Sequence, residues 1–383
     1  MASVDSGPAS LHWRSVAFAL GILLLSAPAP AEDHLIVGVG ASLSDQDKPF
    51  ALLQSLGVSS VRLDAPWRVV ELSPGRYEIP GWLEKNVNEA RSRDIEPFLI
   101  LAYGNQLYDQ DKPRSAATRL AFTRYAAYLV NHFRGRVRYY SIWNEWNAAT
   151  GHTTPGSPDD YIALSKVVYP SLKGVDNSAV ILSTSISDIV SNPKWIERFL
   201  ALGGLRYADG LALNPYNFFL GRKGTPELAL ERVDRIYALA LTHSQGKSVP
   251  IYITEMGYPT YSGQGGRSQD AAADDMARFL LLASTRSHVK AVWWYGFRDQ
   301  GLDPANKEHH FGIYDYQFAP KPAAHALRDV TRLLKATGRL GLVAQHAKGP
   351  KVLAGRCGGR PVEIRLDTYP LELPQPEVCP GKP

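Results

Sequence analysis

The chain has 383 residues, of which 45% are hydrophobic and 21% are charged, with a formal net charge of +5. This balance excludes a mainly disordered chain, and two cysteines are too few for a disulfide-stapled scaffold. The Lys and Arg residues form no run of four or more, so no nucleic-acid partner is expected.

The N-terminus carries a targeting pattern. An apolar run, Val16–Leu25, follows Arg14 and precedes the small-x-small site Ala29-Pro30-Ala31. The run is too short for a membrane span, which needs about 20 apolar residues. It therefore predicts a signal peptide over residues 1–31 and a periplasmic or secreted protein. An uncleaved signal anchor is the alternative, and no later apolar run is long enough to span a membrane.

Short apolar runs then alternate with helical patterns. The eight strand-like runs are Leu35–Gly40, Val58–Asp64, Pro97–Tyr103, Val137–Glu145, Ala179–Ile186, Gly210–Tyr216, Val249–Glu255 and Ala291–Phe297. The longest helices are predicted at Ala116–Phe133, Pro226–Leu241, Asp270–Thr285 and Pro322–Lys335. Ser157 and Thr225 each precede a proline and acidic residues, as helix N-caps do, and Gly57 is expected to end a helix over Pro49–Leu56.

Strand–helix alternation indicates parallel strands in an α/β protein. Eight units match a (β/α)₈ TIM barrel, which typically takes about 250 residues, and we place it at residues 32–338. A doubly wound open sheet is the rival fold. That fold usually carries a dinucleotide-binding loop of the pattern G-x-G-x-x-G after its first strand. The segment from Gly38 to Leu43 lacks the third glycine of this pattern. No cofactor is expected.

Residues 339–383 break the alternation and predict a small β appendage. Lys351–Ala354 and Pro361–Asp367 flank a glycine-rich turn, and a Pro-rich tail follows. Cys357 and Cys379 are the only cysteines. In an oxidising compartment a disulfide between them would hold the tail; two free thiols are the alternative.

Two glutamates end predicted strands. Glu145 closes the fourth and Glu255 the seventh. Catalytic groups of TIM barrels stand at the carboxyl ends of strands. Paired carboxyl groups suit acetal hydrolysis, since one protonates the leaving oxygen while the other attacks or activates water. The alternative is that each glutamate is an ordinary surface or ion-paired residue.

The residues around both glutamates resemble a known family. Trp143-Asn144-Glu145 and Ile253-Thr254-Glu255-Met256-Gly257 are similar to the paired signatures of clan A retaining glycoside hydrolases, which are (β/α)₈ barrels. The resemblance is closest to family 39 and to family 5-like bacterial enzymes that cut exopolysaccharides. It implies Glu145 as acid/base, Glu255 as nucleophile and Asn144 as a contact to the sugar 2-hydroxyl.

Three further segments fit this resemblance. It implies that Arg62 lies beneath the nucleophile and that Tyr216 hydrogen-bonds Glu255. Asn214 stands where the family often has histidine, so its role stays open. On the eighth strand an aromatic floor is expected, formed by either Trp294 or Phe297.

Other polar and aromatic residues follow strand ends. Trp67 and Tyr103 lie where a sugar could stack, although each could equally pack a loop against the barrel. Asn105, Tyr108 and Trp146 share that position. His309 and His310 are adjacent without matching ligand spacing, so no metal is expected.

The sequence therefore predicts an exported retaining glycosidase, acting within a polysaccharide such as a bacterial exopolysaccharide. The expected partner is a poly- or oligosaccharide. A non-catalytic carbohydrate-binding protein on the same barrel is the main alternative. A metal-dependent barrel hydrolase is another.

Overall fold

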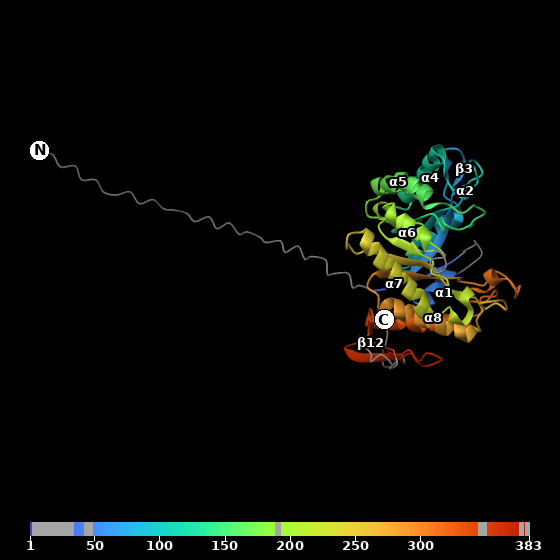
Figure 1. Ribbon diagram of the computed structural model, residues 1–383, viewed down its shortest axis with the longest axis vertical. Helices are drawn as coiled ribbons and strands as arrows, with labels where there is room; N and C mark the ends of the chain where they lie inside the picture. Colours follow the sequence, from blue (N-terminus) through green and yellow to red (C-terminus); the bar gives the residue numbers. More distant parts are fainter. Residues whose placement is uncertain (2–33, 42–48, 188–192, 344–350, 375–378, 380–383) are drawn as a thin grey trace. The chain divides into compact units, whose positions relative to one another are not determined.

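Eight parallel strands form the centre of the described chain (Figure 1). This computed structural model describes residues 1, 34–41, 49–187, 193–343, 351–374 and 379. The strands are β1 (Ile36–Gly40), β2 (Ser60–Pro66), β5 (Glu96–Ala102), β6 (Tyr139–Ile142), β7 (Val180–Leu182), β8 (Leu211–Leu213), β9 (Ile251–Met256) and β10 (Val289–Tyr295). The predicted signal peptide lies outside the described residues.

The strand order closes into a barrel. Hydrogen-bonded neighbours run β7-β6-β5-β2-β1-β10-β9-β8. Parallel bridges from Leu182 to Gly210 and from Ile186 to Leu213 join the two ends. The prediction of a (β/α)₈ barrel is confirmed.

Helices follow the strands as predicted. They are α1 (Pro49–Ser55), α2 (Trp67–Val70), α3 (Gly81–Arg91), α4 (Ala116–His132), α5 (Pro158–Val175), α6 (Lys194–Ala201), α7 (Pro226–His243), α8 (Gln269–Ser284) and α9 (Pro322–Thr337). The side chains of Ser157 and Thr225 cap α5 and α7 by accepting from backbone N–H groups. Gly57 follows α1 with a positive φ of 69°. Within the described ranges, we find no helix with the length and apolarity of a membrane span.

Three predicted strands, β6, β7 and β8, are much shorter than expected, and β8 covers only Leu211–Leu213 instead of residues 210–216. β6 ends at Ile142 rather than Glu145, because the backbone turns into the left-handed region at Trp143 (φ 76°) and Glu145 (φ 49°). β7 ends at Leu182, after which Ser185 and Ile186 form only isolated bridges. Glu145 therefore stands on a loop just beyond its strand.

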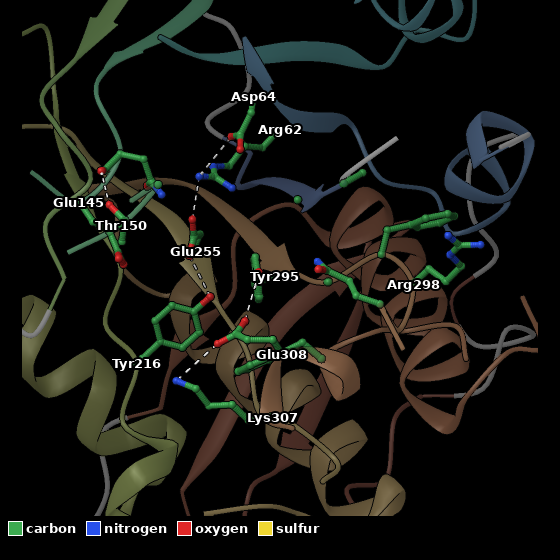
Figure 2. Close-up of a pocket in the computed structure, with 18 of the residues that line it drawn as sticks. Arg62, Asp64, Glu145, Thr150, Tyr216, Glu255, Tyr295, Arg298, Lys307 and Glu308 are labelled. Carbon is green, nitrogen blue, oxygen red and sulfur yellow. Dashed lines mark hydrogen bonds and ion pairs between the residues drawn. The ribbon is translucent and has the colours of Figure 1, made fainter. Parts of the chain in front are cut away.

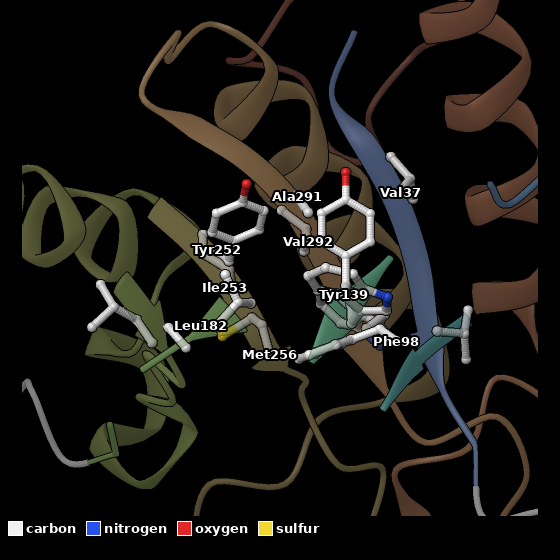
Figure 3. Packing of buried hydrophobic residues seen from close by; sticks show 14 of the residues in the cluster. Val37, Phe98, Tyr139, Leu182, Tyr252, Ile253, Met256, Ala291 and Val292 are labelled. Carbon is white, nitrogen blue, oxygen red and sulfur yellow. The ribbon is translucent and has the colours of Figure 1, made fainter. Parts of the chain in front are cut away.

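Aromatic rings fill the amino-terminal end of the barrel (Figure 3). Tyr139 is the first residue of β6, and Tyr252 the second of β9. The rings of Phe98 and Trp293 have centroids 4.4 Å apart. A Cβ atom at Gly38 would lie 2.4 Å from Trp293 Cδ1. The packing of Trp293 against the backbone therefore accounts for a glycine at position 38, and no phosphate-binding loop is needed to explain it.

Gly38→Ala is expected to lower the free energy of unfolding by about 1–3 kcal/mol, the usual cost of overpacking. The added methyl also meets the backbone oxygen of Ser60 at 2.8 Å, so a side-chain rotation cannot relieve it. Gly81→Ala, at the start of α3, is the control, since nothing lies within 4 Å of its Cβ position. Urea unfolding of both variants tests this; equal stability would contradict the packing argument.

The C-terminal segment forms an antiparallel sheet of β11 (Gly341–Leu342), β12 (Val352–Cys357) and β13 (Arg360–Arg365). The predicted turn over residues 355–359 is too long, because pairing continues to Cys357 and only Gly358 and Gly359, both with positive φ, turn the chain. Cys357 and Cys379 are joined by a disulfide. Arg278 of α8 donates to the carbonyls of Leu366 and Thr368, which attaches this sheet to the barrel.

Smaller elements lie in the connections between the barrel strands and the helices. β3 (Glu71–Ser73) and β4 (Arg76–Tyr77) form a hairpin before α3. Short 3₁₀ helices occupy Gly204–Tyr207, Phe218–Lys223 and Lys307–His310.

Candidate active site

The carboxyl ends of the strands surround a cavity of about 620 Å³. Glu145 and Glu255 both line it, together with Arg62, Asp64 and Tyr216 (Figure 2). Its volume lies within the range of about 300–1,000 Å³ common for small-molecule sites.

Glu255 is held by two hydrogen-bonding partners. It is the penultimate residue of β9, lines the cavity and is 7% exposed. Arg62 Nη2 lies 2.7 Å from Oε1, and the Tyr216 hydroxyl donates to Oε2 at 3.0 Å. Burial raises the pKa of Glu255, and the Arg62 guanidinium and the Tyr216 hydroxyl oppose that rise. Both contacts favour the ionised carboxylate.

Glu145 has a different environment. Its Oε1 accepts one hydrogen bond, from Asn214 Nδ2 at 2.9 Å. Burial, followed by the negative charge of Glu255, raises the pKa of Glu145 to about 7. The two carboxyl groups of one cavity are thus biased toward different protonation states, with the proton on Glu145.

Asn214 is oriented by the strand beside it. It is fully buried, and its Oδ1 accepts from Thr254 Oγ1 at 2.7 Å. This contact turns the amide nitrogen toward Glu145. The residue that departs from the usual histidine therefore contacts the proposed acid/base.

The loop that carries Glu145 is anchored on both sides. The Trp146 backbone N–H donates to Thr184 Oγ1 at 3.0 Å. The buried Lys112 ammonium donates to Ala148 O at 3.0 Å and to Thr153 Oγ1 at 2.6 Å. These contacts hold Glu145 in a left-handed backbone conformation, which residues other than glycine rarely adopt.

The structure separates the predicted aromatic residues into two groups. Tyr103 and Phe297 line the cavity, as does Asn144. Trp67 is 1% exposed and stacks on Tyr108 with centroids 4.7 Å apart, so it belongs to the core. The structure therefore does not place Trp67 in the site.

Trp294 also lies outside the cavity. It is 2% exposed, and its ring packs against Tyr258 and against Phe279 of α8. Successive strand residues point to opposite faces, so Tyr295 faces the cavity instead. Of the two candidates for the aromatic floor, Phe297 is the one that reaches the cavity.

Sequence reasoning missed most of the cavity rim. These residues come from the last position of β10 and from the connections after β6, β8 and β10: Thr150, Gly151, Phe218, Phe219, Tyr295, Arg298, Gln300, Lys307, Glu308 and Phe311. The available signal was the long segment between β10 and α9, since long loops at this face of a barrel carry function.

His309 and His310 belong to that segment and hold its fold. His309 Nδ1 accepts from the Asp303 backbone N–H at 3.2 Å, and His310 Nε2 lies 2.7 Å from Asp303 O. Over the residues that the structure describes, no three His, Cys, Asp or Glu side chains form a group suited to a metal ion.

The fold is similar to solved glycoside hydrolase structures. A family 39 glycoside hydrolase from the gut symbiont Bacteroides cellulosilyticus WH2 matches with a TM-score of 0.75 and 26% identity, over 87% of this chain and 71% of that chain. The GH39 enzyme from Xanthomonas axonopodis pv. citri matches with a TM-score of 0.63 and 18% identity, over 88% and 73%. Xylanase 10B from Thermotoga maritima gives 0.57 and 19%, over 78% and 95%. No protein-family model and no curated protein sequence matches the chain.

This chain is a structural relative of the family 39 glycoside hydrolases. The predicted resemblance to clan A is confirmed, as is the predicted class of enzyme, a glycosidase. The matches below 25% identity support the barrel fold alone.

Proposed function

We propose that the chain is a retaining glycoside hydrolase in which Glu255 is the nucleophile and Glu145 the acid/base. The observation that carries this assignment is the unequal setting of two carboxyl groups in one cavity. Glu255 has a guanidinium at 2.7 Å, whereas the hydrogen-bond donor to Glu145 among the described residues is a neutral amide.

The reaction follows from that setting. The Glu255 carboxylate attacks the anomeric carbon while Glu145 donates its proton to the leaving oxygen, which gives a glycosyl ester on Glu255. Glu145, now ionised, takes a proton from water. That water breaks the ester bond, which releases the sugar with its original anomeric configuration and restores both carboxyl groups.

The substrate is proposed to be a polysaccharide, such as a bacterial exopolysaccharide, cut inside the chain. Phe218, Phe219, Tyr295 and Phe311 at the rim support this, because aromatic faces stack on sugar rings. We also propose that a signal peptide over residues 1–31 directs export. The barrel then spans residues 32–338, and the appendage spans residues 339–383.

Reducing-end release from a panel of bacterial and plant polysaccharides tests the function. Release by the wild type that is lost in both Glu145→Gln and Glu255→Gln supports the assignment. Release that survives in both variants would refute it. No release from any polymer, together with sugar binding, would favour the carbohydrate-binding alternative.

The pH dependence is a separate prediction. The active form has Glu145 protonated and Glu255 ionised, so kcat/KM should fall as pH rises through about 7, the raised pKa of Glu145. The expected slope is about tenfold per pH unit above that point. Initial rates from pH 4 to about 9 measure it, and Glu145→Gln should lack the alkaline limb. An unchanged limb in that variant would assign the proton to another group.

A further inference from the structure

Asp64, Tyr103 and Asn144 form a hydrogen-bonded row along one wall of the cavity. Asn144 Nδ2 donates to the Tyr103 hydroxyl at 3.2 Å, and that hydroxyl donates to Asp64 Oδ2 at 3.4 Å. The row runs from β2, beside Arg62, to the residue that precedes Glu145. It therefore connects the surroundings of the nucleophile with those of the acid/base.

The row has two acceptor atoms that the described residues do not use. Asp64 Oδ1 and Asn144 Oδ1 are both buried and have no hydrogen-bond partner among those residues. Arg62 does not satisfy Asp64, because its Nη2 is 3.8 Å from Oδ1 while it lies 2.7 Å from Glu255. A buried acceptor without a donor is unfavourable, so this row favours a ligand that brings donors.

The middle of the row is rigid. A Cβ atom at Gly151 would lie 2.3 Å from Tyr103 Cδ1, so the loop backbone packs directly on the ring. The ring also meets Trp143 edge-on, with centroids 6.3 Å apart. Asp64, at the end of the row, lines the cavity with its side chain 39% exposed.

We propose that this row binds the hydroxyl groups of a neutral sugar ring at Glu255, and that Asp64 determines specificity against acidic sugars. The inference rests on the proposed function and narrows its substrate class. A carboxylate has only acceptors and receives hydrogen bonds from hydroxyl groups through both oxygens. The carboxylate of a uronic acid brings no donor and repels Asp64. Arg62, which lies 3.8 Å from Asp64, is already paired with Glu255 at 2.7 Å and so offsets little of that repulsion.

Binding to a non-cleaving variant tests this directly. Full-length Glu145→Gln keeps a carbonyl oxygen for Asn214 and leaves the Arg62–Glu255 pair intact. Calorimetry with cello-, manno- and xylo-oligosaccharides is compared with oligogalacturonides and alginate oligosaccharides. We expect binding to at least one neutral series and weaker or no binding to the acidic ones.

Asp64 variants in that background then identify the cause. Adding Asp64→Ala should weaken the neutral binding by about 10–100-fold, the loss of one charged hydrogen-bond acceptor. Asp64→Asn keeps an acceptor but removes the charge. It should therefore weaken neutral binding less than Asp64→Ala does, and it should reduce the difference in affinity between neutral and acidic sugars. Asp159→Asn on the surface of α5 is the control that removes a carboxylate elsewhere. Thermal unfolding of each variant confirms that it is folded.

Four results would overturn the inference: no neutral series binds, the acidic series bind better, Asp64→Ala binds as before, or Asp159→Asn weakens binding equally.

A second experiment separates this inference from the proposed function. The wild type is given the oligosaccharide that binds. If it releases no reducing ends, the proposed hydrolysis fails while the recognition by Asp64 stands. If the wild type hydrolyses the oligosaccharide but Asp64→Ala binds it unchanged, the recognition by Asp64 fails while the proposed hydrolysis stands.

Discussion

Glu255→Gln should lower kcat/KM by at least about 10⁴-fold, the range found when a nucleophile of an interdependent catalytic group is removed. Glutamine is nearly the same size and can still accept from Tyr216, so the loss reflects the missing attack rather than a collapsed site. Aryl glycosides of the sugar identified by the polysaccharide panel give the rates.

Azide distinguishes the roles of the two glutamates. In Glu255→Ala, azide should restore turnover and give a glycosyl azide of inverted configuration, because it attacks the sugar from the vacated side. In Glu145→Ala, azide should attack the glycosyl ester in place of activated water, so the azide product retains configuration. NMR of the anomeric proton separates the two. The reverse pattern would exchange the assignments.

Arg62→Met is expected to affect both stability and rate. It leaves the Glu255 carboxylate, 7% exposed, without its cation. Removing one partner of a buried pair costs about 3–5 kcal/mol of unfolding free energy. The pKa of Glu255 should rise further, so the acid limb of kcat/KM moves to higher pH.

The pH dependence of that stability loss has a defined sign. Raising the folded-state pKa of Glu255 above its unfolded value makes the variant lose stability as pH rises through that interval. The defect should therefore be smaller in acid. Adding Glu255→Gln to Arg62→Met removes the buried charge and should recover part of the loss. Urea unfolding at two pH values measures this; fully additive losses would show that the two residues do not interact.

The sequence could predict Glu255 better than Glu145. Glu255 belongs to a continuous β-strand pattern, and β9 includes it as expected. Glu145 follows a similar pattern, but its strand ends three residues earlier because of left-handed backbone at Trp143 and Glu145. Hydrophobic periodicity does not report such dihedral angles, since non-glycine residues seldom adopt them.

The structure places only some of the predicted aromatic residues at the cavity: Tyr103 and Phe297 line it, whereas Trp67 and Trp294 are buried elsewhere. Trp293, Trp294 and Tyr295 are consecutive, and composition does not say which face of the strand each one takes. The structure turns Trp294 outward to Phe279 and Tyr295 inward to the cavity. The rim residues Lys307 and Glu308 depend on the path of a long loop, which no local pattern determines.

The hydrogen bond from Asn214 to Glu145 has a consequence for the timing of proton transfer in the proposed mechanism. In the proposed mechanism, burial and the negative charge of Glu255 together keep the proton on Glu145 before the first step. Once Glu255 becomes an ester, that charge is gone, and the Asn214 N–H remains to stabilise the Glu145 carboxylate. Because Thr254 fixes the amide, the same donor is in place throughout the cycle. In that mechanism the pKa of Glu145 falls when Glu255 becomes an ester, because one of the two causes that raise it is removed while burial remains.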